Sequence, residues 1–349
     1  METSRPRPAA VNRFRSRRPL FVLLLVGFAL SVLLINVAGS QATFASIKNA
    51  QPGFVLLILL AQALRYVGST GSAYVLAEIF GQRLPFWPLY ETMMAGQALN
   101  RTFSAGGAAG VWARYSFMTR QGMHSGRFVA LLAVEDLIGA VAIFLVFVTG
   151  LAGVVAAEAL PEFGWLILLV FSSGLLVLGA GSLYLYRRRS LVERVAHRSA
   201  RAFSAILARI IGKEVYERDH VDLAVTEFYA AMTRARTDPP RLAVSFLFNL
   251  WRLAFDAASL YLAFWAIGFP ISPGIALVLF TTSSALSTLS AAPGELGVME
   301  TSLAILSTAL GIPSPSAVGA IVLFRALSYW LPIPVGYIMF GHLEKRGLI

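Results

Sequence analysis

The sequence predicts an all-α polytopic membrane protein in which six spanning helices and two re-entrant helical hairpins are arranged as inverted repeats. The first observation is composition, because 57% of the residues are hydrophobic and 13% are charged, about half the charged fraction of a soluble domain. The second is a series of apolar runs long enough to cross a bilayer. The third is an internal duplication, which gives the predicted fold its symmetry.

The duplicated unit is marked by two glycine-containing segments, residues 105–111 and 292–298. When the chain is paired with itself at a separation of 187 positions, 11 of the 52 positions from Leu60 to Val111 are identical. We therefore predict two copies of one membrane unit. The matched positions include Arg65 with Arg252, Ser72 with Ser259, Tyr74 with Tyr261 and Gly81 with Gly268, and Gln62 falls on Asn249.

The apolar runs define the elements in order. Full spans are expected at Leu20–Val37, Phe54–Ala77, Phe128–Gly150, Trp165–Tyr184, Leu242–Ile267 and Val318–Phe340. Two further stretches are interrupted by glycines and small polar residues, and we expect each to enter and leave the membrane on one side. The predicted organisation is a basic N-terminus (1–19), a first helix with an outer loop (20–53), repeat 1 (54–150, hairpin 88–122), a connecting helix (151–186), a cytoplasmic amphipathic insert (187–240), repeat 2 (241–340, hairpin 274–311) and a tail (341–349).

Arginine and lysine in the loops predict the orientation, since basic residues accumulate on the cytoplasmic side. Six arginines precede the first apolar run, and residues 187–240 contain 11 Arg and Lys. The only charged residues in the 151–162 loop are glutamates. We therefore expect both termini in the cytoplasm of a bacterial inner (cytoplasmic) membrane. The two repeats then enter the membrane in opposite senses. The insert at 187–240 fits either a basic helix on the inner leaflet or a cover for the base of the bundle.

Ionisable side chains inside predicted spans are costly in lipid, so they tend to pair or to line a pathway. Arg252 and Asp256 are four positions apart, close enough to pair on one helix face. Such residues have two equally good explanations: internal ion pairs that hold the bundle together, or contacts to a substrate. The intramembrane set is Arg65, Glu135, Asp136, Arg252, Asp256 and Arg325.

The hairpin tips contribute a second set of candidates. Helices that start after Gly107 and Gly294 would direct free N–H groups toward the centre of the protein, a setting that attracts phosphate. Glu295 and Glu300 could titrate, bind a cationic headgroup or neutralise Arg325. We predict that the substrate-binding residues are Arg65, Asn100, Arg101, Arg114, Arg252 and Ser284, and that gating or coupling residues are Glu135, Asp136, Asp256, Glu295, Glu300 and Arg325.

Signatures of enzymes and metal sites are absent from the sequence. The chain has no cysteine, and its four histidines are far apart, so a metal centre is not expected. The motifs G-x-x-x-x-G-K-[ST], G-x-S-x-G and H-E-x-x-H do not occur. We therefore expect no catalytic residues, no cofactor and no enzymatic activity.

Several motifs resemble the lysylphosphatidylglycerol synthase transmembrane-region family of flippase-like membrane proteins. They are N-R-T-F-S-A-G-G at 100–107, E-D-L at 135–137, A-P-G-E-L-G-V-M-E at 292–300 and R-A-L-S-Y-W at 325–330. Where the family often has a proline in the first motif, this chain has Ser104 and Ala105. Synthases of the family carry a further soluble acyltransferase-type domain, and this chain ends at Ile349, so the resemblance implies translocation without synthesis.

The predicted function is that of a lipid translocase, which moves a phospholipid or lipid-linked glycan between leaflets by alternating access at a cavity between the inverted repeats. Two alternatives are a membrane-embedded enzyme that modifies a polyprenyl or glycolipid headgroup, with Glu295 and Glu300 as acid and base, and a scaffold for cell-envelope enzymes. The expected partners are membrane lipids with anionic or glycosylated headgroups. Nucleic acid is not an expected partner, and self-association into a homo-oligomer stays open.

Overall fold

The computed structural model describes residues 50–103, 107–156, 187–211, 217–290 and 296–349, together with single positions at 48, 173, 174, 177, 180, 181 and 184. For residues 156, 202–211 and 289 it describes the backbone alone. The expected first span at 20–37 and most of the connecting span at 165–184 therefore lie outside the described residues. So do Ser104, Gly294 and Glu295 at the predicted hairpin tips.

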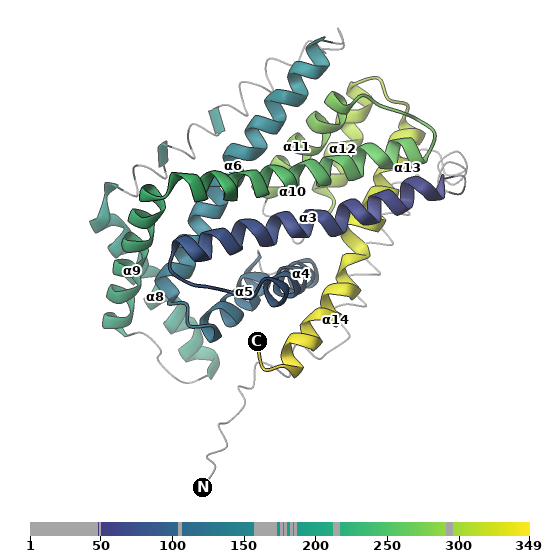
Figure 1. Ribbon diagram of the computed structural model, residues 1–349. Helices are drawn as coiled ribbons and strands as arrows, with labels where there is room; N and C mark the ends of the chain where they lie inside the picture. Colours follow the sequence, from purple (N-terminus) through teal and green to yellow (C-terminus); the bar gives the residue numbers. More distant parts are fainter. Residues whose placement is uncertain are drawn as a thin grey trace.

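The described residues form helices joined by short loops, with no strand among them (Figure 1). The helices are α3 (Pro52–Ile79), α4 (Phe86–Thr102), α5 (Ala108–Arg120), α6 (Ser125–Ala156), α8 (Arg189–Ile211), α9 (Arg218–Thr237), α10 (Pro239–Ala266), α11 (Pro273–Leu289), α12 (Val298–Ala309), α13 (Ser314–Arg325), the π-helical segment η3 (Ala326–Trp330) and α14 (Pro332–Lys345).

Three described helical stretches are long and apolar enough to cross a membrane: Pro52–Ile79, Ser125–Val155 and Ser314–Lys345. They coincide with three of the predicted spans. Helix α10 covers the predicted span at 242–267 but is not among the three, although its 28 residues equal the length of α3. Large apolar side chains face outward on these helices, among them Leu56 and Leu60 on α3 and Val141 and Leu145 on α6, as suits a surface in contact with lipid.

Helices α3 and α10 lie side by side and run in opposite directions (Figure 1). At one end the backbone N–H of Gln51 donates to the carbonyl of Ala266 at 2.9 Å. Near the other end the hydroxyl oxygens of Ser72 and Ser245 are 2.9 Å apart. Gly68 makes this approach possible, because a Cβ atom there would lie only 2.7 Å from the carbonyl oxygen of Phe248.

Helix boundaries repeat along the chain. Helices α3 and α10 each contain 28 residues, α4 and α11 each contain 17, and both pairs begin 187 positions apart. Beyond the tips the register changes, because α5 follows Gly107 (φ 84°) and α12 follows Gly297 (φ 81°). The prediction that the second half-helix starts after Gly294 was therefore wrong in register. Gly297 supplies the left-handed backbone that starts α12, as Gly107 does for α5.

Each of the two copies also packs onto the other through its last helix. Helix α4 packs against α14, and α11 packs against α6. Glycines allow both approaches, since a Cβ at Gly336 would lie 2.5 Å from the Met94 carbonyl oxygen and one at Gly150 would lie 2.6 Å from the Leu277 Cβ. Helices α4 and α11 are thus each held by a helix from the other half of the chain.

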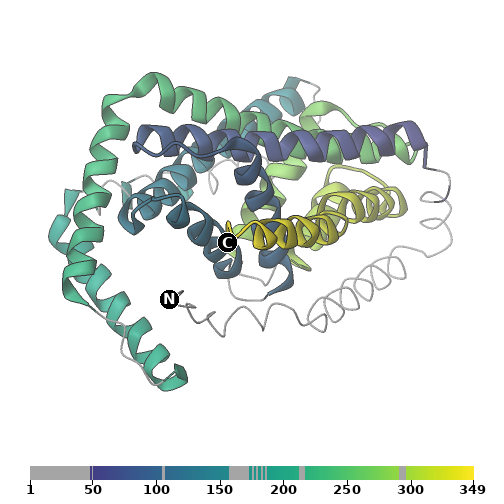
Figure 2. The same ribbon diagram turned by 60° about the horizontal axis from the view of Figure 1, so that its bottom comes forward.

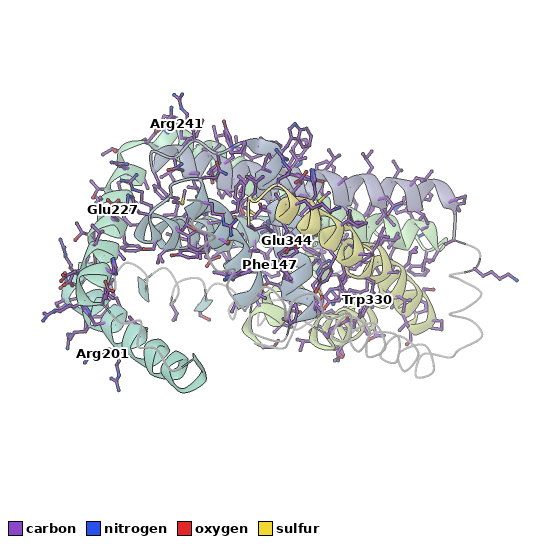
Figure 3. The ribbon with its side chains drawn as sticks, turned by 90° about the horizontal axis from the view of Figure 1, so that it is seen from below. Phe147, Arg201, Glu227, Arg241, Trp330 and Glu344 are labelled. Carbon is purple, nitrogen blue, oxygen red and sulfur yellow. The ribbon has the colours of Figure 1, made fainter. Side chains whose placement is uncertain are left out.

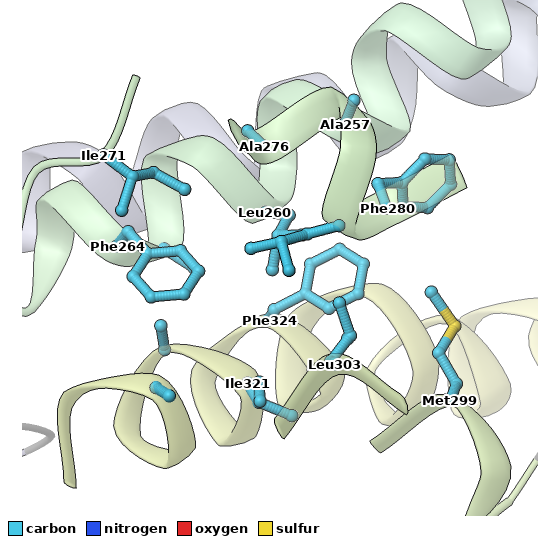
Figure 4. Close-up of a cluster of buried hydrophobic side chains, with 14 of the residues drawn as sticks. Ala257, Leu260, Phe264, Ile271, Ala276, Phe280, Met299, Leu303, Ile321 and Phe324 are labelled. Atoms are coloured by element: carbon cyan, nitrogen blue, oxygen red, sulfur yellow. The ribbon is translucent and has the colours of Figure 1, made fainter. Parts of the chain in front are cut away.

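A large hydrophobic cluster fills the space between α10, α11, α12 and α13 (Figure 4). Leu260 and Phe264 from α10 face Leu303 from α12 and Phe324 from α13 in its interior. All four side chains are 2% exposed or less. This apolar packing holds α12 and α13 in place, and two of the charged residues described below, Glu300 and Arg325, lie on these two helices.

Residues 187–240 contain α8, α9 and the first turn of α10, which lie at one end of the bundle (Figure 2). Helix α9 packs on α6, where Arg127 and Glu227 form an ion pair at 2.5 Å. Arg234 of α9 also donates to the carbonyl of Phe80, just after α3, at 3.0 Å. Glu227 lies on this bundle-side helix, whereas Arg201 projects outward from α8 (Figure 3).

Candidate functional site

Charged side chains meet where α3 crosses α10. The Nε atom of Arg65 lies 3.0 Å from Oδ1 of Asp256, and the second carboxylate oxygen of Asp256 lies 3.6 Å from Nη1 of Arg252. The predicted pairing of Arg252 with Asp256 along one helix face is thereby confirmed. Asp256 is 5% exposed, and it bridges two arginines that occupy equivalent places in the two copies.

Two further polar links join the same helices. The side-chain amide of Gln62 donates to the Ser259 hydroxyl at 2.8 Å, and that of Asn249 donates to the Ser72 hydroxyl at 2.7 Å. Gln62 and Asn249 are paired by the internal duplication, as are Ser72 and Ser259. The two bonds therefore join residues that the 187-position pairing relates to each other.

The second copy contributes an ion pair of its own. Arg325, in the last turn of α13, places Nε 2.6 Å from Oε1 of Glu300, in the first turn of α12. The other carboxylate oxygen of Glu300 accepts the backbone N–H of Gly297 at 2.9 Å. Both positions suit the helix dipole, which favours an acid at a helix start and a base at a helix end. Of the three roles considered for Glu300, the structure shows its pairing with Arg325.

Arg101, in the last turn of α4, reaches across to the π-helical segment. Its Nη1 donates to the carbonyl of Tyr329 at 2.8 Å, and its guanidinium carbon lies 4.7 Å from the centroid of the Tyr329 ring. The guanidinium carbon of Arg325 lies 4.2 Å from the same ring centroid. One buried tyrosine therefore makes cation–π contacts with two arginines from different halves of the chain. π-helical turns of this kind occur frequently at functional sites.

These groups form one electrostatic unit, which we call the arginine centre. Arg101 interacts electrostatically with Arg65 and Arg325 as well as with Tyr66 and Tyr329. Arg101 is 8% exposed and Arg325 is 5% exposed. The arginine centre consists of Arg65, Arg101, Arg252 and Arg325, the carboxylates Asp256 and Glu300, and the rings of Tyr66 and Tyr329.

The structure places five of the other predicted residues in separate settings. Arg114 of α5 pairs with Glu135 of α6 at 2.5 Å. The side-chain oxygen of Asn100 accepts the backbone N–H of Gly110, which ties α4 to α5 near the hairpin tip. Asp136 is exposed on α6, and Ser284 is half-buried on α11. Glu295 lies outside the described residues.

Sequence reasoning did not single out Tyr66 and Tyr329. Tyr329 is 1% exposed and Tyr66 is 3% exposed. The spacing of Tyr329 from Arg325, four positions along a helix, is the signal that could have indicated it. The expectation that no metal centre exists receives no test from this structure, although the described residues contain no group of three potential ligands.

Long apolar helices that surround buried ion pairs define an integral membrane protein of the helical class. The chain belongs to the lysylphosphatidylglycerol synthase TM region family, whose sequence profile matches residues 24–336. A UPF0104 membrane protein of Methanocaldococcus jannaschii is 22% identical over 322 residues, which cover 91% of this chain and 93% of that protein. A UPF0104 membrane protein of Pyrococcus horikoshii is 23% identical over 345 residues, with 94% and 98% coverage.

Proposed function

We propose that the protein is a lipid translocase, in which the arginine centre contacts a lipid headgroup as it passes between leaflets. The observation that carries the proposal is the position of this centre, where α3 and α10, the equivalent helices of the two copies, cross. Charged groups at such a place are costly in a membrane protein and commonly mark a substrate path. Membership in a family of membrane proteins agrees with this assignment.

The arrangement that we infer is a pair of inverted repeats with re-entrant hairpins. The antiparallel packing of α3 and α10 supports the inversion, because equivalent helices of inverted copies run in opposite directions. The side-chain amide of Gln82, before α4, donates to the carbonyl of Gln121, after α5. The two ends of the first hairpin thus lie together, as a hairpin that enters and leaves on one side requires.

Alternating access follows from this arrangement. In our proposal the headgroup enters between the repeats while the acyl chains stay in the bilayer, against apolar side chains such as Leu56 and Leu145. The two hairpins open the path to one leaflet at a time. We place the protein in the cytoplasmic membrane with both termini inside, because basic residues are concentrated at the termini and in the 187–240 insert.

The contacts of Glu300 favour transport over catalysis. One of its carboxylate oxygens pairs with Arg325 and the other accepts the N–H of Gly297. A general base needs a carboxylate that can reach the proton of a substrate. Glu300 is instead engaged at both oxygens, which suits a structural or gating role in a translocase.

Reconstitution tests the proposal directly. Purified protein in liposomes should move a labelled lipid between leaflets, and Arg252→Ala or Glu300→Gln should slow the transfer about tenfold or more, since each removes a partner from a buried ion pair. Arg189→Ala is the control, because Arg189 is exposed on α8, where it pairs with its helix neighbour Glu193 and lies over the ring of Tyr229, outside the arginine centre. Failure to transfer any anionic, cationic or glycosylated lipid would contradict the proposal.

A further inference from the structure

The two helices of the 187–240 segment have different surroundings. Helix α9 packs on α6 and α3, so it covers one end of the bundle. Helix α8 packs on α9, and its second half extends away from the other helices (Figure 2). The sequence predicted either a cover for the base of the bundle or a basic helix on a membrane leaflet. Because α9 fills the first role, α8 is available for the second.

One side of α8 is held by α9. The side chains of Ala196 and His197 are partly buried, and Nε2 of His197 lies 2.8 Å from Oδ1 of Asp222 in α9. The guanidinium carbon of Arg189 lies 5.4 Å from the centroid of the Tyr229 ring, also in α9. These contacts fix which face of α8 is turned toward the bundle and which face is turned away from it.

The face turned away is basic. Arg194, Arg198 and Arg201 are four and then three positions apart, a spacing that aligns side chains along one side of a helix. All three are exposed, and Arg201 projects outward in Figure 3. Among the residues that the structure describes, none of the three forms an ion pair with a carboxylate. We call these three arginines the basic face of α8.

An apolar side adjoins the basic face. Val195 is 57% exposed. In the sequence, Phe203 and Ile206 follow Val195 by 8 and 11 positions, which places them at the same side of a continuous helix. The backbone is helical as far as residue 211. Arginines along one side of a helix and apolar residues along the next are typical of helices that lie in a membrane interface.

We propose that α8 lies on the membrane leaflet next to this end of the bundle and binds anionic phospholipids through its basic face. The helix begins shortly after the apolar run at 165–184, which is predicted to span the membrane, so lipid headgroups are its nearest neighbours. Each arginine near an anionic leaflet favours binding roughly fivefold. An acidic protein would match the arginines, but lipid also matches the apolar side at Val195. The inference concerns a surface separate from the arginine centre and does not depend on lipid transfer.

Fluorescence quenching by lipid tests the inference on the full chain. The sequence contains no cysteine, so Val195→Cys can carry a single fluorophore. The labelled protein is placed in nanodiscs of phosphatidylcholine alone or with roughly 30% phosphatidylglycerol, both containing a doxyl-labelled quencher lipid. Quenching should be about threefold stronger in the anionic discs, and roughly 0.5 M NaCl should remove most of the difference by screening. Equal quenching in the two discs would overturn the assignment to anionic lipid.

Variants locate the surface. Combining Arg194→Gln, Arg198→Gln and Arg201→Gln should lower the ratio of bound to free α8 on the order of a hundredfold, so quenching should fall to its level in zwitterionic discs. The control makes the same change in charge at exposed basic residues outside α8, namely Arg218, Lys345 and Arg346. It should keep the quenching of the unmodified protein. Equal loss in both triple variants would show that net charge, and not the basic face, governs binding.

The remaining outcomes separate this inference from other partners and from the proposed function. Absence of quenching in both discs would place α8 away from lipid, overturn the inference and favour an acidic protein partner. Binding of α8 without lipid transfer in liposomes would contradict the translocase proposal and leave the assignment of α8 in place. Transfer without binding of α8 would contradict only the assignment of α8.

Discussion

At the scale of residues, the contact between α3 and α10 depends on glycines. A Cβ atom at Gly68 would lie 2.7 Å from the Phe248 carbonyl oxygen and 2.8 Å from the Arg252 backbone nitrogen. Both neighbours are backbone atoms of a packed helix, which cannot turn aside as a flexible side chain can. Even one methyl group at this position must therefore separate the two helices that carry the Arg65–Asp256 ion pair.

We expect Gly68→Ala to destabilise the protein by about 1–3 kcal/mol, the usual cost of overpacking a well-packed interface. The thermal unfolding midpoint, followed by intrinsic tryptophan fluorescence in detergent, measures the effect. Gly53→Ala on the same helix is the control, because a Cβ there would meet nothing within 4 Å. A midpoint for Gly68→Ala equal to that of Gly53→Ala would show that α3 and α10 are not in close contact.

The paired amide and hydroxyl links allow a prediction about coupling between residues. Asn249→Ala and Ser72→Ala should be non-additive, with a coupling free energy of about 0.5–1.5 kcal/mol, because the two side chains share a hydrogen bond. Asn249→Ala and Gln62→Ala should be additive within about 0.5 kcal/mol, because these side chains belong to different links. Denaturant titration of each single and double variant measures both quantities. Additivity of Asn249→Ala with Ser72→Ala, together with coupling of Asn249→Ala to Gln62→Ala, would contradict these two hydrogen bonds.

At the scale of elements, α9 is attached to the membrane helices by apolar packing of Ala231 and Ala235 and by a few polar contacts. Arg127 of α6 pairs with Glu227, and Arg234 of α9 donates to the carbonyl of Phe80. The hydrogen bond from Arg127 holds the pKa of the Glu227 carboxyl below its ordinary value of 4.5. Because the folded pKa is depressed, the pair stabilises the attachment above pH 4.5, and this contribution is lost as the pH falls through the folded pKa.

We therefore expect Glu227→Gln to weaken the attachment of α9 at neutral pH. In this variant the attachment should no longer weaken further when the pH is lowered. Hydrogen-exchange protection factors for residues 218–237 should fall in this variant at pH 7. In the unmodified protein they should fall only when the pH drops below about 4.5. Glu193→Gln is the control, since Glu193 pairs with an exposed arginine on α8. Equal protection in all three proteins would show that the Arg127 pair does not hold α9.

At the scale of the whole molecule, the two copies are interlocked. Helix α14, the last helix of the second copy, packs on α4 of the first, and α6 of the first copy packs on α11 of the second. The stretch from Ser314 to Lys345 contains 32 residues, as does α6, but it is interrupted by the π-helical segment, whereas α6 is one continuous helix. The two halves of the molecule thus share a plan and differ at the break beside Tyr329.

Cysteine labelling in intact cells tests the proposed inversion of the two copies. The sequence contains no cysteine, so single-cysteine variants need no background substitutions. Arg83→Cys and His124→Cys flank the first hairpin and should react with a membrane-impermeant maleimide only after the cells are opened. Pro270→Cys and Ser314→Cys flank the second hairpin and should react from outside. All four positions are exposed. Labelling of all four from one side would contradict the inverted arrangement.

The sequence alone predicted features that depend on neighbours along the chain. Apolar runs predicted three of the long helices, and the four-residue spacing of Arg252 and Asp256 predicted their ion pair. The 187-position pairing predicted that the helix beyond the second tip starts after Gly294, but it starts three positions later, after Gly297. Loop register depends on which glycine adopts a positive φ, and several glycines were available near the second tip.

Tertiary structure alone decided which distant groups meet. Arg101 and Tyr329 are 228 positions apart, and Gln62 and Ser259 are 197 positions apart, yet each pair is in hydrogen-bond contact. Such contacts follow from how helices pack and where their glycines allow close approach, and residue types along the chain do not encode them. The sequence determined that this protein is helical and embedded in a membrane. Helix packing decided that its arginines converge, because convergence depends on the angles and separations of helices that are far apart in the chain.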